Sequence, residues 1–317
     1  MAASGRIGAA LHELGAANQL AAIVLAERLG VAAAWLTTAG AGPDAMGIFA
    51  AAAVRTSRIG LGTAIVPVFP RHPLALVQQA LVVAALAPGR FRLGVGPSHR
   101  PSVEGTFGIP FVRPLEYLAE YVTILRAALQ EGRVEFEGQR LRAHAEVPSP
   151  PNVPVLISAL RPGAYRLAGR IADGAIAWVC PLPYLRDQAL PALRAGAALR
   201  PHPQAGSRSP LIAHCFVAVH DDAAEVRAAA RQRLTGYARL PFYQEMFALA
   251  GYPEARQGTM SDAMLDAVVV HGDEPAVAAH LRHYLDAGMD EVIASVLIAG
   301  GDRPASLERT LRLLGTL

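Results

Sequence analysis

The chain alternates short β-rich runs with helical patterns eight times, and this repeat constrains its fold more than any other feature of the sequence. The β-rich runs cover residues 7–11, 33–37, 59–66, 91–96, 155–158, 175–179, 211–219 and 291–298. The helical patterns cover residues 17–29, 44–55, 73–86, 114–130, 162–170, 183–199, 222–238 and 304–314. Strands that alternate with helices predict a parallel sheet with helical crossovers. Eight such units predict an α/β fold, the (β/α)8 TIM barrel.

Two segments depart from this alternation. Residues 133–142, RVEFEGQRLR, predict a β-hairpin that turns at Glu137 and Gly138, inserted between the fourth helix and the fifth strand. Residues 237–273 predict a partly helical insertion after the seventh strand. Insertions on a barrel usually wall the active site, because that site lies among the loops that follow the strands. Since no linker divides the chain, we expect residues 1–317 to form one barrel domain.

Composition excludes several kinds of chemistry. All 29 basic residues are arginine, so no lysine is available for a Schiff base, for pyridoxal phosphate or for a phosphate-binding loop. The arginines are scattered and the net charge is only +3, which argues against a nucleic-acid partner. His280 and His283 are three residues apart without an evident third ligand, so we expect no metal site.

The sequence also favours a cytoplasmic protein. Its start, MAASGRIGAA, has no basic segment followed by an apolar run, so we expect no export signal. The longest apolar stretch, residues 74–88, contains Gln78 and Gln79, and we expect no membrane span. Cys180 and Cys215 are too few for a disulfide framework, which fits a reducing compartment.

Five motifs carry a resemblance to a known family. They are LGTAIVPVFPRHP at 61–73, GRFRLGVGPSHRP at 89–101, VEFEGQRL at 134–141, VPVLISALRPGAYRLAGRIADGAI at 153–176 and VVVHGDEPAVAAHLRHYLDAGMDEVI at 268–293. In this order and at barrel-compatible spacing, they resemble the bacterial luciferase-like monooxygenase superfamily of flavin- and deazaflavin-dependent oxidoreductases. The branch that uses coenzyme F420 is the most similar. The resemblance implies F420 as cofactor, with FMN as the alternative.

The same resemblance implies where the cofactor lies. In this superfamily the third strand ends in a non-proline cis peptide that backs the ring system, and Ala64-Ile65 matches that position. The loop from Ser158 to Gly163 opens a helix, whose free N–H groups and Arg161 are suited to a phosphate. The expected cofactor contacts are Trp35, Thr38, Thr63, Ala64, Ile65, Gly96, Ser98, Ser158, Ala159, Leu160, Arg161, Gly163, Trp178, Val179 and Cys180.

Three residues are candidates for proton transfer. His99 falls where sugar-phosphate dehydrogenases of the F420 branch carry a general-acid glutamate, and imidazole titrates near neutral pH. The alternative is that His99 only lines the pocket. His12 and Glu13 follow the first strand, where members of the superfamily place substrate or ring contacts.

Departures from the family narrow the substrate. The sugar-phosphate enzymes carry an Asp-His pair after the second strand and hold the phosphate with lysines, whereas this chain has Thr37-Thr38 and no lysine. Glucose 6-phosphate is therefore not expected as substrate. The tryptophan of that motif is kept as Trp35, which packs against either the ring system or the core.

Three classes of function remain open. The first is F420-dependent hydride transfer to or from a small organic molecule, an activated double bond in a biosynthetic intermediate, or a modified peptide. The second is an FMN-dependent monooxygenase that uses molecular oxygen, and the third is a barrel that binds a flavin without catalysis. By family analogy we expect a homodimer.

Overall fold

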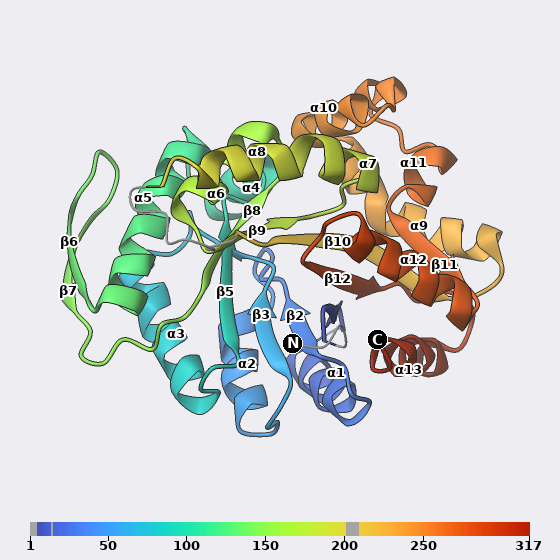
Figure 1. Cartoon of the computed structure of the whole chain (residues 1–317), viewed down its shortest axis with the longest axis horizontal. Coiled ribbons are helices and arrows are strands. Elements are labelled where there is room, and N and C mark those ends of the chain that lie inside the picture. Colours follow the sequence, from blue (N-terminus) through green and yellow to red (C-terminus); the bar gives the residue numbers. More distant parts are fainter. Residues whose placement is uncertain (1–4, 14, 201–208) are drawn as a thin grey trace.

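A computed structural model describes residues 5–13, 15–200 and 209–317 as a closed parallel barrel with helices around it (Figure 1). Its eight strands are β1 (Ile7–Ala10), β2 (Ala33–Leu36), β3 (Gly60–Thr63), β5 (Phe91–Gly96), β8 (Val155–Ala159), β9 (Gly174–Ala177), β10 (Leu211–Val219) and β12 (Glu291–Val296). β1 pairs in parallel with β2 on one side and β12 on the other, which closes the ring. The predicted TIM barrel is confirmed.

Two short strands were not predicted as separate elements. The run predicted over 59–66 is interrupted, because β3 ends at Thr63 and the chain rejoins the sheet as β4 (Val66–Pro67), which pairs with β5. Further along, β11 (Val269–Gly272) pairs with the last residues of β10. It extends the sheet outside the ring of eight strands.

The helices cover the outside of the barrel. They include α1 (Ala16–Arg28), α2 (Ala45–Ala53), α3 (Pro73–Leu86), α5 (Pro114–Arg126), α6 (Pro162–Ile171), α7 (Leu182–Tyr184), α8 (Leu190–Ala197), α9 (Ala223–Ala238), α12 (Glu274–Asp286) and α13 (Arg303–Leu314). Two π-helical turns complete the predicted helices over 114–130 and 183–199, namely η1 (Ala127–Glu131) after α5 and η2 (Leu185–Ala189) between α7 and α8. Asp44, Asp222 and Asp302 each accept a backbone N–H at a helix start, which stabilises it.

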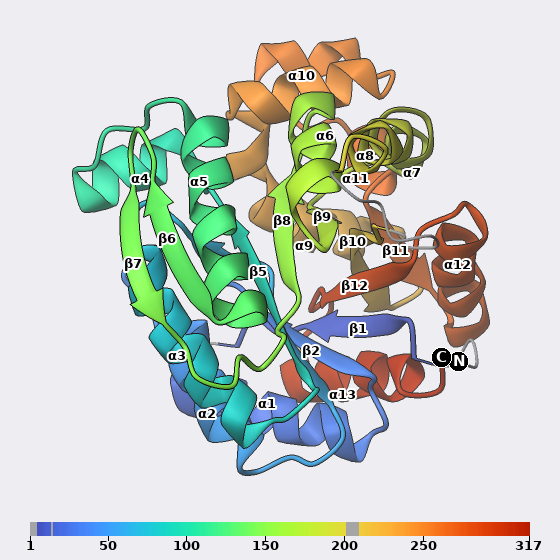
Figure 2. The same ribbon diagram turned by 60° about the vertical axis from the view of Figure 1, so that its left-hand side comes forward.

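The inserted hairpin lies outside the barrel, beside α5 (Figure 2). Its strands are β6 (Arg133–Glu137) and β7 (Arg142–Glu146), so the prediction that residues 133–142 hold both strands was wrong for the second one. The reason is a contact with α5. The Glu120 carboxylate accepts hydrogen bonds from the N–H groups of Gln139, Arg140 and Leu141, which fixes this segment as the connecting loop.

The predicted helical insertion follows α9. It consists of α10 (Pro241–Leu249), the 3-10 helix η3 (Pro253–Gln257) and α11 (Asp262–Asp266), and β11 and α12 come after it. A further short helix, α4 (Arg100–Phe107), follows β5 and was not predicted. Both α4 and α10 come after the carboxyl ends of barrel strands, the end at which TIM barrels carry their active sites.

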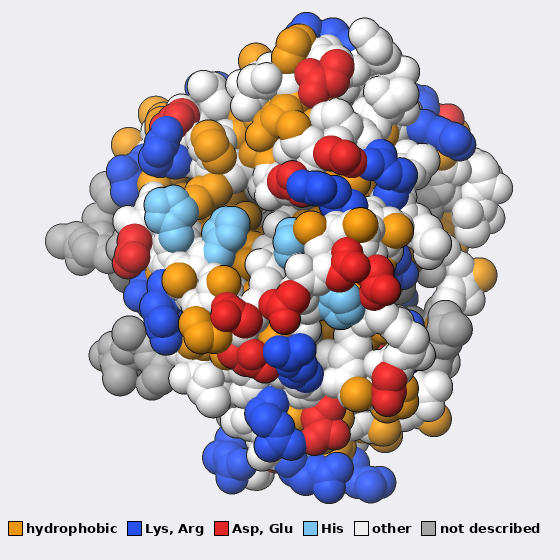
Figure 3. Space-filling view, turned by 90° about the vertical axis from the view of Figure 1, so that its right-hand side faces the viewer, with side chains coloured by type: hydrophobic (Ala, Val, Ile, Leu, Met, Phe, Trp, Pro, Cys, Tyr) orange, Lys and Arg blue, Asp and Glu red, His pale blue; other side chains and the backbone are white. Residues whose placement is uncertain are grey.

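The surface on the side of α12 and α13 has mixed charge. Figure 3 shows acidic and basic side chains interspersed there with apolar ones. Ion pairs between helices include that of Arg309 on α13 with Glu274 on α12 and that of Arg227 on α9 with Asp266 on α11. Among the described residues, no helix has the length and apolar character needed to cross a membrane.

Candidate active site

A cavity of about 660 Å³ opens at the carboxyl ends of the barrel strands. This volume lies within the range of small-molecule and cofactor sites. Predicted site residues that line it are Thr38, Ala64, Ile65, Ser98, His99, Ser158, Ala159, Leu160, Arg161, Gly163 and Trp178. They come from the end of β8 and from the loops after β2, β3, β5, β8 and β9, so the structure brings together residues that are far apart in the sequence.

One wall of the cavity is the bulge at Ala64 and Ile65. The peptide bond between these residues is cis, as the resemblance implied. The Thr37 hydroxyl donates to the Ala64 carbonyl at 2.8 Å, and the Thr38 N–H donates to the Ile65 carbonyl at 3.1 Å. The two threonines therefore bind both carbonyl groups of the bulge.

A second wall is the start of α6. Pro162 has no N–H, and the N–H groups of Ala164 and Tyr165 bond to the Arg161 carbonyl. The Gly163 N–H has no partner among the described residues, and this glycine borders the cavity. The Arg161 guanidinium lies 4.7 Å from the ring centroid of Phe242. A free N–H at the positive end of a helix, together with an arginine, is suited to bind an anionic group such as a phosphate.

His99 lies in an aromatic part of the cavity. Its ring packs edge-on against Tyr237 and Tyr243, at centroid distances of 6.1 and 5.8 Å. Although His99 precedes α4, its side chain does not cap that helix, and it has no hydrogen bond within the described parts of the chain. Burial lowers the pKa of His99 below its usual value of about 6.5, so the ring is neutral near pH 7.

Trp178 forms a rigid part of the cavity wall. Its indole stacks on His214 at a centroid distance of 3.6 Å, and its Nε1–H donates to the Tyr237 hydroxyl at 2.9 Å. Its carbonyl accepts the Tyr243 hydroxyl at 3.2 Å. The position of Trp178 is therefore determined by contacts with β10, α9 and α10.

His12, predicted as a catalytic residue, belongs to a hydrogen-bonded chain inside the barrel and is not among the residues lining the cavity. The Val179 N–H donates to His214 Nδ1 at 3.2 Å. His214 Nε2 therefore carries the ring hydrogen and donates to Ser295 Oγ at 2.7 Å, and Ser295 can in turn donate to His12 Nε2 at 3.0 Å. This chain of donors leaves the hydrogen of a neutral His12 on Nδ1.

Burial and the nearby Arg233 lower the pKa of His12 to about 4. Glu13, the third candidate for proton transfer, forms an ion pair with Arg303 at 3.0 Å. Neither residue is placed in the cavity, so among the three candidates only His99 lines it.

Two expected cofactor contacts are instead part of the barrel interior. Trp35 is fully buried and lies over Gly8 and Gly62, where an added Cβ would come within 2.7 and 2.4 Å of its ring. Of the two alternatives for Trp35, the structure therefore shows packing against the core. Thr63 is also fully buried, and its hydroxyl bonds to both the N–H and the carbonyl of Gly94.

Three more expected contacts do not line the cavity. Gly96 leaves room for the Ser158 side chain, because a Cβ at position 96 would lie only 2.0 Å from the Ser158 hydroxyl. Val179 is buried with φ at 54°, and its N–H is directed to His214. Cys180 is buried against Tyr165, and burial raises the pKa of its thiol to about 12.

The residues that close the cavity were not predicted from the sequence. Tyr237 at the end of α9 and Phe242, Tyr243 and Leu249 of α10 line one side, while Phe111 and Leu115 line another. The available signal was the aromatic content of the insertion, GYARLPFYQEMFALAGY at 236–252. The described residues contain no group of three potential metal ligands among their histidine, cysteine and acidic side chains.

A TIM barrel with a cavity at the carboxyl ends of its strands, bordered by a helix start suited to an anion and by a neutral histidine, has the features of a cofactor-binding enzyme. The family model for luciferase-like monooxygenases matches residues 1–291. The chain therefore belongs to the luciferase-like monooxygenase family, and its relatives identify it as an oxidoreductase.

Relatives of this chain include an uncharacterized protein and F420-dependent dehydrogenases. An uncharacterized protein of Mycobacterium tuberculosis is 30% identical over 89% of this chain and 92% of its own length. The F420-dependent glucose-6-phosphate dehydrogenase of Kineococcus radiotolerans is 27% identical over 82% of this chain and 78% of that enzyme. The corresponding enzyme of Intrasporangium calvum is 36% identical, over 51% of this chain and 52% of that enzyme.

Solved structures with the same fold bind different cofactors. An F420-dependent secondary alcohol dehydrogenase with an F420–acetone adduct aligns with a TM-score of 0.80 at 18% identity, over 98% of each chain. The oxygenating component of a Pseudomonas putida diketocamphane monooxygenase, in complex with FMN, aligns with a TM-score of 0.74 at 16% identity, over 98% of this chain and 96% of that one. At such identities these structures show the fold alone.

Proposed function

We propose that this chain is an F420-dependent oxidoreductase that transfers a hydride between the deazaflavin and a small organic substrate. The observation that supports it most is that the anion-binding start of α6, the Ala64–Ile65 bulge and His99 all border one cavity. The F420-dependent dehydrogenases among the relatives support the choice of cofactor.

The residues of the cavity are suited to this cofactor. Arg161 and the Gly163 N–H would hold the anionic side chain, since charged groups at a helix start bind phosphate well. Ala64 and Ile65 present an apolar surface on which a planar ring system can lie. When bound, the deazaflavin supplies a two-electron hydride chemistry that no side chain of this protein offers.

His99 is the residue that we propose for proton transfer. Hydride transfer to a carbonyl carbon requires a proton at the oxygen, and hydride transfer from the corresponding alcohol carbon releases one. The neutral His99 ring has one nitrogen that donates and one that accepts. Both nitrogens are without a partner in the described parts of the chain, so both are available to a substrate.

The charges of the cavity lining argue against a sugar phosphate as substrate. The only charged side chains among the described residues lining the cavity are Arg161 and Glu245, and Glu245 pairs with Arg256 at 3.2 Å. With Arg161 assigned to the cofactor, the described lining residues offer no cation for a second phosphate. We therefore propose an uncharged small molecule or biosynthetic intermediate, or a modified peptide side chain, as substrate.

A second candidate is an FMN-dependent monooxygenase, which the FMN-bound structure with the same fold favours. Titration of the apoprotein with F420 and with FMN, followed by fluorescence, tests the choice. Micromolar binding of F420 would support the proposal, and micromolar binding of FMN alone would refute it. We further propose a cytoplasmic homodimer, by analogy with the family, which light scattering of the purified protein can test.

A further inference from the structure

The Tyr237 hydroxyl has a hydrogen that no described residue accepts. The indole Nε1–H of Trp178 donates to this hydroxyl at 2.9 Å, and an indole nitrogen is never an acceptor. The Tyr237 oxygen therefore accepts this bond, and its own hydrogen must point to another group. Within the described residues no side chain or carbonyl accepts it, and Tyr237 lines the cavity.

The neighbouring tyrosine of the cavity is different. The Tyr243 hydroxyl donates to the Trp178 carbonyl at 3.2 Å, so its hydrogen is already bound. The two rings are in contact, with centroids 4.8 Å apart. Two adjacent tyrosines thus differ in one respect: the hydrogen of Tyr237 is available to a ligand and that of Tyr243 is not.

The surroundings of Tyr237 determine what it can bind. The edge of the His99 ring lies beside it, and the apolar side chains Phe242, Leu249 and Phe111 line the same cavity. Burial raises the pKa of Tyr237, so the phenol keeps its hydrogen at neutral pH. A ligand here meets an apolar wall with one oriented O–H donor, and the matching chemistry is an apolar molecule with one strong acceptor.

We propose that Tyr237 donates a hydrogen bond to the carbonyl oxygen of an apolar ketone or aldehyde, which is the substrate of the cavity. This inference rests on the proposed function, because a carbonyl carbon is a hydride acceptor and a hydrogen bond to its oxygen increases its electrophilicity. Trp178 is the positioning residue, since its N–H occupies the Tyr237 lone pair and directs the hydrogen away from the indole.

The test uses two probes of nearly the same shape. Acetophenone has a carbonyl group, and α-methylstyrene has a methylene group in its place. Infrared difference spectra of acetophenone labelled with ¹³C at the carbonyl, bound to the full chain without cofactor, report the hydrogen bond directly. We expect the C=O stretch to lie at lower frequency than in hydrocarbon solvent. In Tyr237→Phe the shift should be lost, and affinity for acetophenone should fall about 3- to 10-fold, as for one neutral hydrogen bond.

Tyr243→Phe is the matched control, because it removes a hydroxyl whose hydrogen is already bound within the protein. This variant should keep the carbonyl shift, and neither variant should change the affinity for α-methylstyrene by more than about twofold. Near-ultraviolet circular dichroism of each variant checks that the surroundings of the tryptophans are retained.

Several results would overturn the inference. They are an unshifted carbonyl band in the wild-type protein, the same band in Tyr237→Phe, equal loss in Tyr243→Phe, or no binding of acetophenone at millimolar concentration. None of them depends on F420. A protein that binds acetophenone through Tyr237 but does not bind F420 would keep this inference and refute the proposed function. A protein that binds F420 but gives an unshifted carbonyl band would refute this inference and leave the proposed function intact.

Discussion

The two ends of the barrel each hold a cavity, and they use their polar groups in opposite ways. The cavity at the carboxyl ends, of about 660 Å³, presents three groups that can form hydrogen bonds beyond those they make with described residues: the His99 ring, the Tyr237 hydroxyl and the Gly163 N–H. The cavity at the amino ends, of about 430 Å³, is lined by charged groups that bond to one another. There Arg92 donates two hydrogen bonds to Glu291, at 2.5 and 2.9 Å.

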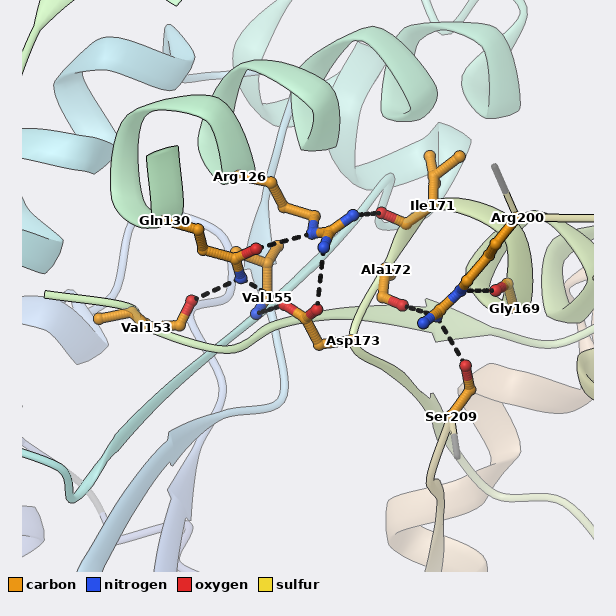
Figure 4. Close-up of polar contacts among 10 residues, drawn as sticks. All are labelled: Arg126, Gln130, Val153, Val155, Gly169, Ile171, Ala172, Asp173, Arg200 and Ser209. Atoms are coloured by element: carbon orange, nitrogen blue, oxygen red, sulfur yellow. Dashed lines mark hydrogen bonds and ion pairs between the residues drawn. The ribbon is translucent and has the colours of Figure 1, made fainter. Parts of the chain in front are cut away.

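Figure 4 shows the polar contacts around the loops at the amino ends of β8, β9 and β10. Asp173 accepts from Gln130 Nε2 at 2.6 Å and from the Val155 N–H at 2.8 Å, and it faces Arg126 at 3.3 Å. Arg200 binds the carbonyl groups of Gly169 and Ala172 and the hydroxyl of Ser209. These bonds connect loops of the protein to each other. The unpaired polar groups at the carboxyl end are thus suited to bind a ligand, whereas the bonds at the amino end stabilise the barrel, which is the usual division in TIM barrels.

Replacement of His99 gives the largest effect expected at the carboxyl end. If His99 transfers the proton, His99→Ala should lower turnover by about 10² to 10⁴ fold with little change in cofactor affinity. Because burial lowers its pKa, the limb of the pH profile should lie below about pH 6.5, and in the direction in which His99 accepts a proton, activity should fall as pH drops through that limb. Steady-state kinetics across pH measure the turnover and the position of this limb.

His72→Ala is the control for this prediction, since His72 caps α3 and does not line the cavity. Its turnover should match that of the wild type. A loss below about tenfold in His99→Ala, mostly in KM, would mean that His99 only lines the pocket.

Replacement of Asp173 tests the amino end. Asp173→Ala leaves the Gln130 amide, the Val155 N–H and the Arg126 guanidinium without their acceptor, so we expect the free energy of unfolding to fall by about 2 to 4 kcal/mol. Urea denaturation measures this loss. Glu308→Ala, which removes an exposed ion pair on α13, should cost under about 0.5 kcal/mol. A large loss of cofactor affinity in folded Asp173→Ala would break the division between the two ends.

Replacement of Arg161 tests whether the start of α6 binds the anionic part of the cofactor. Arg161→Ala should weaken F420 binding by about 10- to 100-fold, the amount expected for a charge-assisted hydrogen bond, and should leave stability nearly unchanged. Arg170→Ala, an exposed arginine in the last turn of the same helix, serves as control. Equal affinity in all three proteins, measured by fluorescence titration, would place the anion elsewhere.

The smallest expected effect concerns the interior between the two ends. The pKa of His12 is about 4 in the folded chain and about 6.5 when unfolded, so the unfolded state binds more protons between these values. Stability should therefore fall as pH drops from about 6.5 to 4, by about 1 kcal/mol at pH 5.5 from this residue. Urea midpoints at pH 7.5 and 5.5 measure the decline, which His12→Phe should reduce.

His144 provides the opposite case for the same measurement. Hydrogen bonds to Glu135 and Glu137 raise the pKa of this exposed histidine on β7. Its stabilising contribution is therefore present below about pH 6.5 and is lost as pH rises through the folded pKa. His144→Ala should make the decline on acidification slightly larger. The same decline in the wild type and in His12→Phe would mean that another group is responsible.

Much of the fold could be predicted because its signals are local. The eight strands and the helices around them follow from hydrophobic periodicity and from helix-start residues such as Asp44 and Pro73, which act within a few residues of themselves. The hairpin was placed correctly, yet its second strand was not. Its loop is fixed by Glu120, nineteen residues before Gln139, and local patterns carry no signal for such a contact.

The candidate site was predictable only in part. Motifs that resemble the family placed Ala64, Ile65, Ser98, His99 and the loop from Ser158 to Gly163, and these line the cavity. Neighbouring positions of the same motifs, such as Thr63 and Gly96, are oriented elsewhere. Successive residues of a strand point to opposite sides, so a motif identifies a strand end more easily than the side chains that face the ligand.

The sequence by itself determined the alternation that makes a barrel, the absence of lysine chemistry and the family, because all three depend on residue identity and short-range order. The tertiary structure decided which polar groups remain available to a ligand. Trp178 and Tyr237 are 59 residues apart and His214 and Ser295 are 81 apart, so their hydrogen bonds form only when the closed barrel brings β9, α9, β10 and β12 together. A polar side chain can bind a ligand only if the folded protein has not already paired its donors and acceptors. Which groups are paired depends on packing in three dimensions.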